Sequence, residues 1–291
     1  MRRNLFRGAF PVSSRSHIRI LNCCWLMTAV FEYYWINLSF IPVTMKVYVV
    51  NLKTSLERRS YIEKLLQRFG TFFETNVVEA VDGRYLPDDE LGKIWDQNRT
   101  YRNYGRYMSG GEIGCSLSHR KCYEEILKNG DDMAMVIEDD VSFQEENVRE
   151  VVAAAEKVLR TSRPVIILLT GSYWYMKKKD LPGTRFSLAG LYEGMGTVAY
   201  MINNAAAKIL DAAPRAYLAD DWYNIRSFGI TVYAVNPHIA GDVGLFGSDI
   251  FGNYQGAVRK NLGLCKKLQL YRRGLMRRFL GRIGHWEKRA F

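Results

Sequence analysis

The chain has 291 residues, of which 48% are hydrophobic and 24% are charged, which is typical of a folded globular protein and excludes a disordered or fibrous one. No two of its five cysteines form a CxxC pair, so we expect neither a disulfide framework nor a zinc knuckle, and a reducing compartment fits best. These are Cys23, Cys24, Cys115, Cys122 and Cys265.

The net charge of +11 is concentrated at the two ends of the chain. Residues 259–291 hold eleven Lys or Arg and one acid, and residues 1–44 hold five Arg and one Glu. Residues 45–258 are therefore mildly acidic, and the basic character belongs to the ends. We predict three parts from this division: an N-terminal extension over 1–44, a folded domain over 45–258 and a basic tail over 259–291.

The first 44 residues have two interpretations. Ile20–Val43 is long enough to span a membrane as a signal anchor, although Glu32 interrupts its apolar run. Alternatively, Met45 begins the folded protein, because MKVYVVNL is typical of a first buried strand. We prefer the second interpretation and expect the extension to be disordered or absent from the natural product.

From Met45 onward, apolar strand patterns alternate with helical ones. We expect strands at 46–52, 76–81, 133–137, 165–170, 197–202 and 230–237. We expect helices at 54–69, 109–129, 146–161 and 203–213, and another after Asp220-Asp221-Trp222. Two capping boxes, Thr54 with Glu57 and Ser109 with Glu112, are predicted to begin the first two helices. This order predicts an α/β fold with a largely parallel sheet.

The basic tail has the pattern of an amphipathic helix. Large apolar residues recur every three or four positions, at Leu264, Leu268, Tyr271, Leu275, Phe279, Ile283 and Trp286. Lys and Arg fill the remaining positions, which is typical of a helix that lies on an anionic membrane. Nucleic-acid binding and a helix packed on its own domain, with a solvated basic face, are the alternatives.

Three adjacent carboxylates, Glu138, Asp139 and Asp140, follow the short apolar strand MAMVI. Ligands collect at the carboxyl ends of strands in open α/β sheets, and oxygen ligands suit Mn²⁺ or Mg²⁺. Residues i and i+2 of an extended segment project to one side, so we expect Glu138 and Asp140 to share a cation. Asp139 would face away and bind a ribose hydroxyl or cap a helix. The alternative is that the triplet only caps the following helix.

Three other groups are candidates for the same site. Arg58 and its neighbour Arg59 lie at a strand-to-helix junction, where they would neutralise a diphosphate, or they are ordinary surface arginines. His119 lies within the glycine-containing helix GEIGCSLSHR and is either a ligand contact or a packing residue. Asp220 and Asp221 precede a tryptophan and are either N-terminal helix acids or groups that deprotonate a sugar hydroxyl.

Taken in order, these segments resemble glycosyltransferase family 25, the lipooligosaccharide galactosyltransferases and their collagen-modifying relatives. The segments are VYVVNLKTSLERR, EAVDG, GEIGCSLSHRKCYEEIL, VIEDDVSF, ADDW and GSDI. The resemblance covers Lys46 to Ile250. It implies a GT-A-like, Rossmann-type fold, a UDP-sugar donor, most often UDP-galactose, dependence on Mn²⁺ and inversion at the anomeric carbon.

The resemblance also implies roles for individual residues. Glu138 and Asp140 occupy the positions of the family's metal-binding motif, and Asn51, Leu52 and Arg58 lie in the segment that holds the nucleotide. Further residues in matching blocks are Asp82, Glu112 and His119. The stretch PHIAGDVGLF departs from the family pattern, which leaves His238, Asp242 and Asp249 as candidates for a third metal ligand or an acceptor contact.

Together with these residues, the resemblance implies a metal-assisted inverting glycosyltransferase that moves a hexose, with galactose as first choice, to a terminal sugar of a lipooligosaccharide or lipopolysaccharide core. Asp221 is the expected base and Asp220 the second choice. The basic tail would hold the enzyme at the cytoplasmic face of the inner membrane, beside a lipid-anchored oligosaccharide, with no role for nucleic acid. The alternatives are a metal-dependent sugar-phosphate nucleotidyltransferase and a catalytically inactive, membrane-associated sugar-binding protein.

Overall fold

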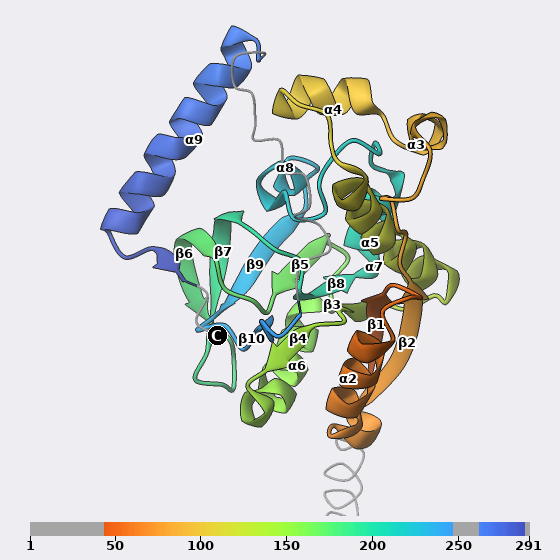
Figure 1. Ribbon diagram of the computed structural model, residues 1–291. Coiled ribbons are helices and arrows are strands. Elements are labelled where there is room, and N and C mark those ends of the chain that lie inside the picture. The colour runs from red at the N-terminus through yellow and green to blue at the C-terminus, as the bar shows by residue number, and fades with distance from the viewer. Residues whose placement is uncertain (1–43, 247–261, 289–291) are drawn as a thin grey trace, which may run out of the picture. The chain divides into compact units, whose positions relative to one another are not determined.

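The computed structural model describes residues 44–246 and 262–288, which contain a mixed β-sheet with helices on both faces (Figure 1). The strands are β1 (Met45–Asn51), β2 (Phe73–Glu79), β3 (Met133–Glu138), β4 (Val141–Phe143), β5 (Val165–Leu168), β6 (Tyr173–Asp180), β7 (Ser187–Gly194), β8 (Ala199–Asn203), β9 (Thr231–Asn236), β10 (Ala240–Asp242) and β11 (Trp286–Glu287). The helices are α2 (Leu56–Gln67), the 3₁₀ turn η1 (Gly70–Phe72), α3 (Asp88–Ile94), α4 (Gln97–Tyr104), α5 (Gly110–Lys128), α6 (Glu145–Leu159), α7 (Asn204–Ala212), α8 (Trp222–Arg226) and α9 (Leu264–Arg282).

The main sheet has nine strands in the order β11-β6-β7-β9-β5-β8-β3-β1-β2. β1 is parallel to both β2 and β3, and β5 is parallel to β9. β8 is antiparallel to β3 and β5, β7 is antiparallel to β9 and β6, and β11 is antiparallel to β6. The α/β class is confirmed, and the sheet is mixed because β8, β7 and β11 run against their neighbours.

Alternate residues of the central strands bury into two separate cores. Val47 and Val49 of β1 pack with α2 and α6 on one face, whereas Tyr48 packs with α5 and α7 on the other. Figure 1 shows the same arrangement, with α2 and α6 on one side of the sheet and α5 and α7 on the other. Strands buried on both faces read as continuous apolar runs, which explains why the sequence pattern located them.

The two predicted capping boxes have different outcomes. At α5, the Ser109 side chain accepts from the Glu112 backbone and the Glu112 side chain accepts from the Ser109 backbone, as predicted. At α2, the N-cap is Ser55, so the predicted box of Thr54 with Glu57 is wrong. The N-cap of α6 is Gln144, so the acidic triplet does not cap that helix either.

Some expectations fall outside the described residues. The extension before Thr44, the GSDI segment and Asp249 all belong to this part of the chain. The division into extension, domain and tail therefore stays a prediction. The sequence analysis also missed the β6–β7 hairpin, in which KKK occupies part of β6, and the short β4–β10 ladder.

Glycines let the loop after β2 lie directly on the first turns of α5. A Cβ atom on Gly114 would meet the carbonyl oxygen of Val81 at 2.4 Å and the nitrogen of Gly83 at 2.7 Å. One turn further along α5, Ser118 Oγ accepts from the Val81 nitrogen at 2.8 Å and donates to the Gly114 carbonyl at 2.6 Å. The glycines predicted to permit close approach are therefore used for backbone packing.

We expect Gly114→Ala to lower the free energy of unfolding by about 1–3 kcal/mol, because the new methyl group meets rigid backbone atoms. The matched control is Gly92→Ala in α3, where the methyl group would meet nothing within 4 Å. This control should leave stability unchanged or raise it by up to about 1 kcal/mol, since alanine favours helix. Urea denaturation measures both. Equal effects from the two variants would contradict the proposed contact.

Candidate active site

The parallel pairing of β1 with β3 brings two predicted site residues together. Val50 lies opposite Glu138 in the ladder, so Asn51 and Asp139 leave the same edge of the sheet as neighbours. Asn51 Nδ2 donates to Asp139 Oδ2 at 2.7 Å, and both side chains are buried. Burial raises the pKa of Asp139, while the bonds from Asn51 and Arg58 act in the opposite direction. The Asp139 side chain is thus held inside the site by these bonds, and the expectation that it faces away from the other two acids is wrong.

Arg58 binds two of the three acids. It lies in the first turn of α2, where its Nη1 is 3.0 Å from Asp139 Oδ1 and 3.2 Å from Asp140 Oδ2. The neighbouring Arg59 pairs with Glu63 on the helix surface instead. Of the two predicted arginines, only Arg58 therefore lies at the acidic triplet, where its charge offsets part of the carboxylate repulsion.

Asp140 has the most unusual environment of the triplet. Its Oδ1 is buried and has no hydrogen-bond partner among the described residues. Burial, followed by the charge of Glu138, raises its pKa to about 6, and Asp139 and Asp242 add to this against Arg58. Asp242 comes close because β10 pairs with β4, placing Asp242 opposite Val141. An orphaned carboxylate oxygen among several acids fits a hard divalent cation.

Glu138 contacts the opposite wall of the site. The hydroxyl of Thr197 donates to Glu138 Oε1, and His119 Nε2 lies 3.5 Å from the same oxygen. His119 is buried on α5, where its Nδ1 lies 2.9 Å from the Tyr200 hydroxyl. Neither Thr197 nor Tyr200 was predicted, because each lies on or just before β8 and meets these groups only after the sheet forms.

The two predicted base candidates have different surroundings. Asp221 is the N-cap of α8, is buried, and accepts from the Tyr104 hydroxyl at 2.6 Å. Asp220 is half-buried and accepts from the Gly196 nitrogen at 3.2 Å, next to the Thr197 that bonds Glu138. Burial raises the pKa of Asp220, and the charges of Asp221 and Glu138 add to this. Asp220 is therefore electrostatically coupled to the acidic triplet.

The remaining candidates are engaged elsewhere or in local structure. Asp82 forms a two-pronged pair with Arg84, which lowers its pKa. Leu52 lies in the turn after β1, where its carbonyl accepts from the Ser55 nitrogen. Glu112 pairs with Arg106, and His238 Nδ1 lies 2.8 Å from Glu287. Asp242 is thus the described third-ligand candidate that lies near Asp140.

Chelator-treated protein should be more stable with Asp140→Asn at neutral pH. A carboxyl group whose pKa rises from 3.8 to about 6 on folding favours the folded state when protonated. That contribution is full below about pH 4 and is lost as the pH rises through about 6. The variant stays neutral at every pH, so its free energy of unfolding should exceed that of the parent by about 1–3 kcal/mol at about pH 7.

Urea denaturation at about pH 4.5 and about pH 7.5 measures this difference, with the exposed Asp89→Asn as the charge-removal control. The gain from Asp140→Asn should shrink at the lower pH. A gain of equal size at both pH values, or a loss at the higher one, would show that Asp140 is not destabilised in the folded protein.

Comparisons with known proteins identify the family of this chain. The sequence profile of "Glycosyltransferase family 25 (LPS biosynthesis protein)" matches residues 44–222, more than half of the chain. Procollagen galactosyltransferase 2 of Mus musculus is 32% identical over 117 residues, which are 39% of this chain and 18% of that protein. The probable inactive glycosyltransferase 25 family member 3 of Rattus norvegicus is 35% identical over 108 residues, 36% of this chain and 18% of that protein.

The chain thus spans less than a fifth of the length of either curated relative in these matches. Among solved structures, the mannose-1-phosphate geranyltransferase from Thermus thermophilus is similar with a TM-score of 0.36 and 14% identity, covering 69% of this chain and 76% of that one. The profile match spans the site residues from Asn51 to Asp221, whereas Asp242 lies beyond it. This chain belongs to glycosyltransferase family 25.

Proposed function

We propose that the chain is a metal-assisted inverting glycosyltransferase that moves a hexose, galactose first among the candidates, from a UDP-sugar to a lipooligosaccharide core. The observation that carries this proposal is the acidic end of β3, where Asp140 Oδ1 is buried without a partner in the described part of the chain. The family's association with LPS biosynthesis supports the acceptor, and the galactosyltransferase named among the relatives supports the sugar.

Glu138, Asp140 and Asp242 are the residues that would hold Mn²⁺ or Mg²⁺. The charges of Glu138 and Asp242 both contribute to the raised pKa of Asp140, so the three carboxylates influence one another electrostatically. Such an ion, when bound, neutralises the charge that develops on a departing diphosphate. In this assignment, Thr197 and His119 orient Glu138 by contacting its Oε1.

Arg58, Asn51 and Asp139 would bind the nucleotide part of the donor. Arg58 already lies over the acids, so a small rotation lets its guanidinium meet a diphosphate that arrives with the cation. Asn51 holds Asp139 through a 2.7 Å bond, which leaves the carboxylate oriented to accept from a ribose hydroxyl.

Asp220 is a better candidate than Asp221 for the base that deprotonates the acceptor hydroxyl. Asp221 is occupied by Tyr104, by its own helix and by Arg273, whose Nη2 is 3.8 Å away. Burial and the charges of Asp221 and Glu138 raise the pKa of Asp220, which makes it a stronger base than an ordinary aspartate. We therefore propose Asp220 as the base and Asp221 as the residue that begins α8 beside it.

Purified protein supplied with UDP-galactose and Mn²⁺ should release UDP, and Asp140→Ala should lower the rate about 100-fold or more. Asp220→Asn should lower the transfer rate by a similar factor, since it removes the base. Asp89→Asn, an exposed carboxylate paired with Lys93, is the control and should leave both rates unchanged.

The same assay separates the alternatives. Equal UDP release by the parent and Asp140→Ala would exclude the metal assignment. Pyrophosphate release from a nucleoside triphosphate and a sugar phosphate would favour a nucleotidyltransferase. Binding of the donor without turnover would favour an inactive sugar-binding protein. One relative is named as a probable inactive member of the family.

We also propose that α9 holds the enzyme on an anionic membrane, on the cytoplasmic face of the inner membrane. Of the helices within residues 44–246 and 262–288, none combines the length and apolar character needed to cross a bilayer. α9 carries seven Lys or Arg and no acid. Leu280 is buried, but seven large apolar side chains on α9 or just after it are between 44% and 82% exposed: Leu264, Leu268, Tyr271, Leu275, Phe279, Ile283 and Trp286.

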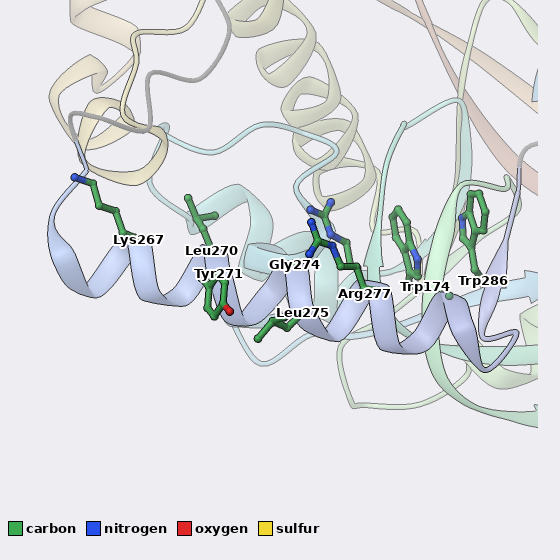
Figure 2. A pocket seen from close by; sticks show the side chains of 10 residues that line it. Trp174, Lys267, Leu270, Tyr271, Gly274, Leu275, Arg277 and Trp286 are labelled. Atoms are coloured by element: carbon green, nitrogen blue, oxygen red, sulfur yellow. The ribbon is translucent and has the colours of Figure 1, made fainter.

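The orientation of α9 supports this proposal. Its basic residues attach it to the domain: Arg273 Nε is 2.8 Å from Glu193 Oε2, and Arg277 Nη1 is 3.2 Å from Glu193 Oε1. Figure 2 shows Tyr271 and Leu275 pointing away from the side on which Arg277 lies. A helix packed on its own domain with a solvated basic face would bury these apolar side chains, whereas here they are exposed and two basic ones are paired.

A groove of about 810 Å³ runs beside α9 and adds to the amphipathic surface. Trp174 and Trp286 stack at one end with ring centroids 5.7 Å apart, and Tyr271, Lys267 and Arg278 line it as well (Figure 2). Aromatic rings next to cationic side chains suit the boundary between lipid headgroups and acyl chains.

The double variant Leu268→Glu with Phe279→Glu should weaken binding to phosphatidylglycerol-containing vesicles by at least about tenfold, because it removes two apolar side chains from the lipid. Tyr85→Glu, which changes a residue 82% exposed on another loop, should leave binding unchanged. Vesicle co-sedimentation measures both. Unchanged binding by the double variant, or equal binding of the parent to neutral vesicles, would contradict the proposal.

A further inference from the structure

Three potential metal ligands converge between α5 and the end of β3. The donor atoms of Cys115, His119 and Glu138 all lie within 4.8 Å of one another. Cys115 and His119 are four residues apart on α5, so they lie on the same face of the helix, one turn apart. The proposed transfer reaction gives the thiol no role.

His119 is already oriented as a ligand. Its ring is 1% exposed, and its Nε2 has no hydrogen-bond partner among the described residues. Its Nδ1 lies 2.9 Å from the Tyr200 hydroxyl, which is 2.9 Å from the hydroxyl of Tyr123. Metal-binding histidines are typically held in this way, with the second nitrogen bonded to an outer group that fixes the ring and its tautomer.

The other two ligands face the same point. Glu138 Oε1 is 3.5 Å from His119 Nε2, close to the separation of about 3.4 Å that two ligands have on a tetrahedral ion. The Glu138 side chain is 25% exposed, which gives an ion access from solvent. The Cys115 sulfur lies beside them, and burial raises the pKa of this thiol, so it carries a proton while no cation is bound.

We propose that Cys115, His119 and Glu138 form a three-ligand site for a thiophilic divalent cation such as Zn²⁺. Sulfur and imidazole ligands select Zn²⁺ over Mn²⁺ or Mg²⁺, which prefer the carboxylate oxygens near Asp140. Binding releases the thiol proton of Cys115 to solvent, and the resulting thiolate bonds to the ion. Three protein ligands leave a fourth position open for water or a substrate oxygen.

The site shares Glu138 with the proposed nucleotide-metal site. Zn²⁺ would therefore inhibit the Mn²⁺-dependent reaction by withdrawing Glu138, and Cys115→Ser would relieve that inhibition. This consequence rests on the proposed function, whereas metal binding itself requires neither donor nor activity.

The test uses Co²⁺ as a spectroscopic substitute for Zn²⁺, added under reducing, oxygen-free conditions to the full chain. Only the two cysteines on α5 are kept in this experiment. The other three are first changed to serine: Cys23, Cys24 and Cys265. We expect one equivalent of Co²⁺ to produce a thiolate-to-cobalt charge-transfer band and tetrahedral visible bands, both abolished by excess Zn²⁺. Cys115→Ser should remove the charge-transfer band and weaken Zn²⁺ binding by at least about tenfold.

The matched control is Cys122→Ser, which changes a buried cysteine two turns further along α5 and should keep the band. Tyr200→Phe leaves the ligands in place and should weaken Zn²⁺ binding by about 10–100-fold, because it removes the bond to His119. A band that survives Cys115→Ser, or Co²⁺ bound without any charge-transfer band, would overturn the proposal. In that case His119 would only orient the Glu138 side chain. The proposed function does not depend on this outcome, because donor turnover is measured separately.

Discussion

The main constraint on this protein is the gathering of negative charge at the end of one buried strand. β3 delivers Glu138, Asp139 and Asp140 to the edge of the sheet, and the β4–β10 ladder adds Asp242. Burial and mutual repulsion work against these carboxylates, which is why the pKa of Asp140 rises to about 6. Asn51 and Arg58 offset part of this cost through their bonds to Asp139 and Asp140. The positions of β1 and α2 beside the end of β3 allow these contacts to form.

The three acids divide the site into two chemically different halves. Asp139 and Asp140 face the end of β1 and the start of α2, where the Asn51 amide and the Arg58 guanidinium meet them. Glu138 faces α5 and β8, where a hydroxyl, an imidazole and a thiol lie close together. One half suits hard cations and phosphate oxygens, and the other suits a softer ion. Asp139 and Asp140 lie in the turn after β3, so strand alternation does not fix their direction, and the three consecutive acids reach both halves.

Local signals in the sequence were sufficient for much of the fold. The Ser109–Glu112 capping box and the apolar run before Glu138 depend on neighbours in the chain, and both were predicted. The antiparallel direction of β8 and the contacts of Arg58, 81 residues from Asp139, depend on the assembled sheet. The orientation of α9 was also beyond the sequence, because its apolar and basic faces could each have met the domain. For Cys115 and His119, the sequence held one usable signal: their spacing of four residues on a predicted helix places both side chains on the same face.

The contact between Gly83 and the first turns of α5 has a consequence for how this protein can diversify. Because backbone meets backbone at both Gly83 and Gly110, the segment between them begins and ends at a rigid clamp. That segment contains α3 and α4. Its sequence and length could change without displacing Ser118 or His119, which lie on α5. Within this segment, the hydroxyl of Tyr104 donates to Asp221, the neighbour of the candidate base Asp220. Sequence changes in this one short stretch would therefore alter the surroundings of Asp221 while the acidic end of β3 stays the same.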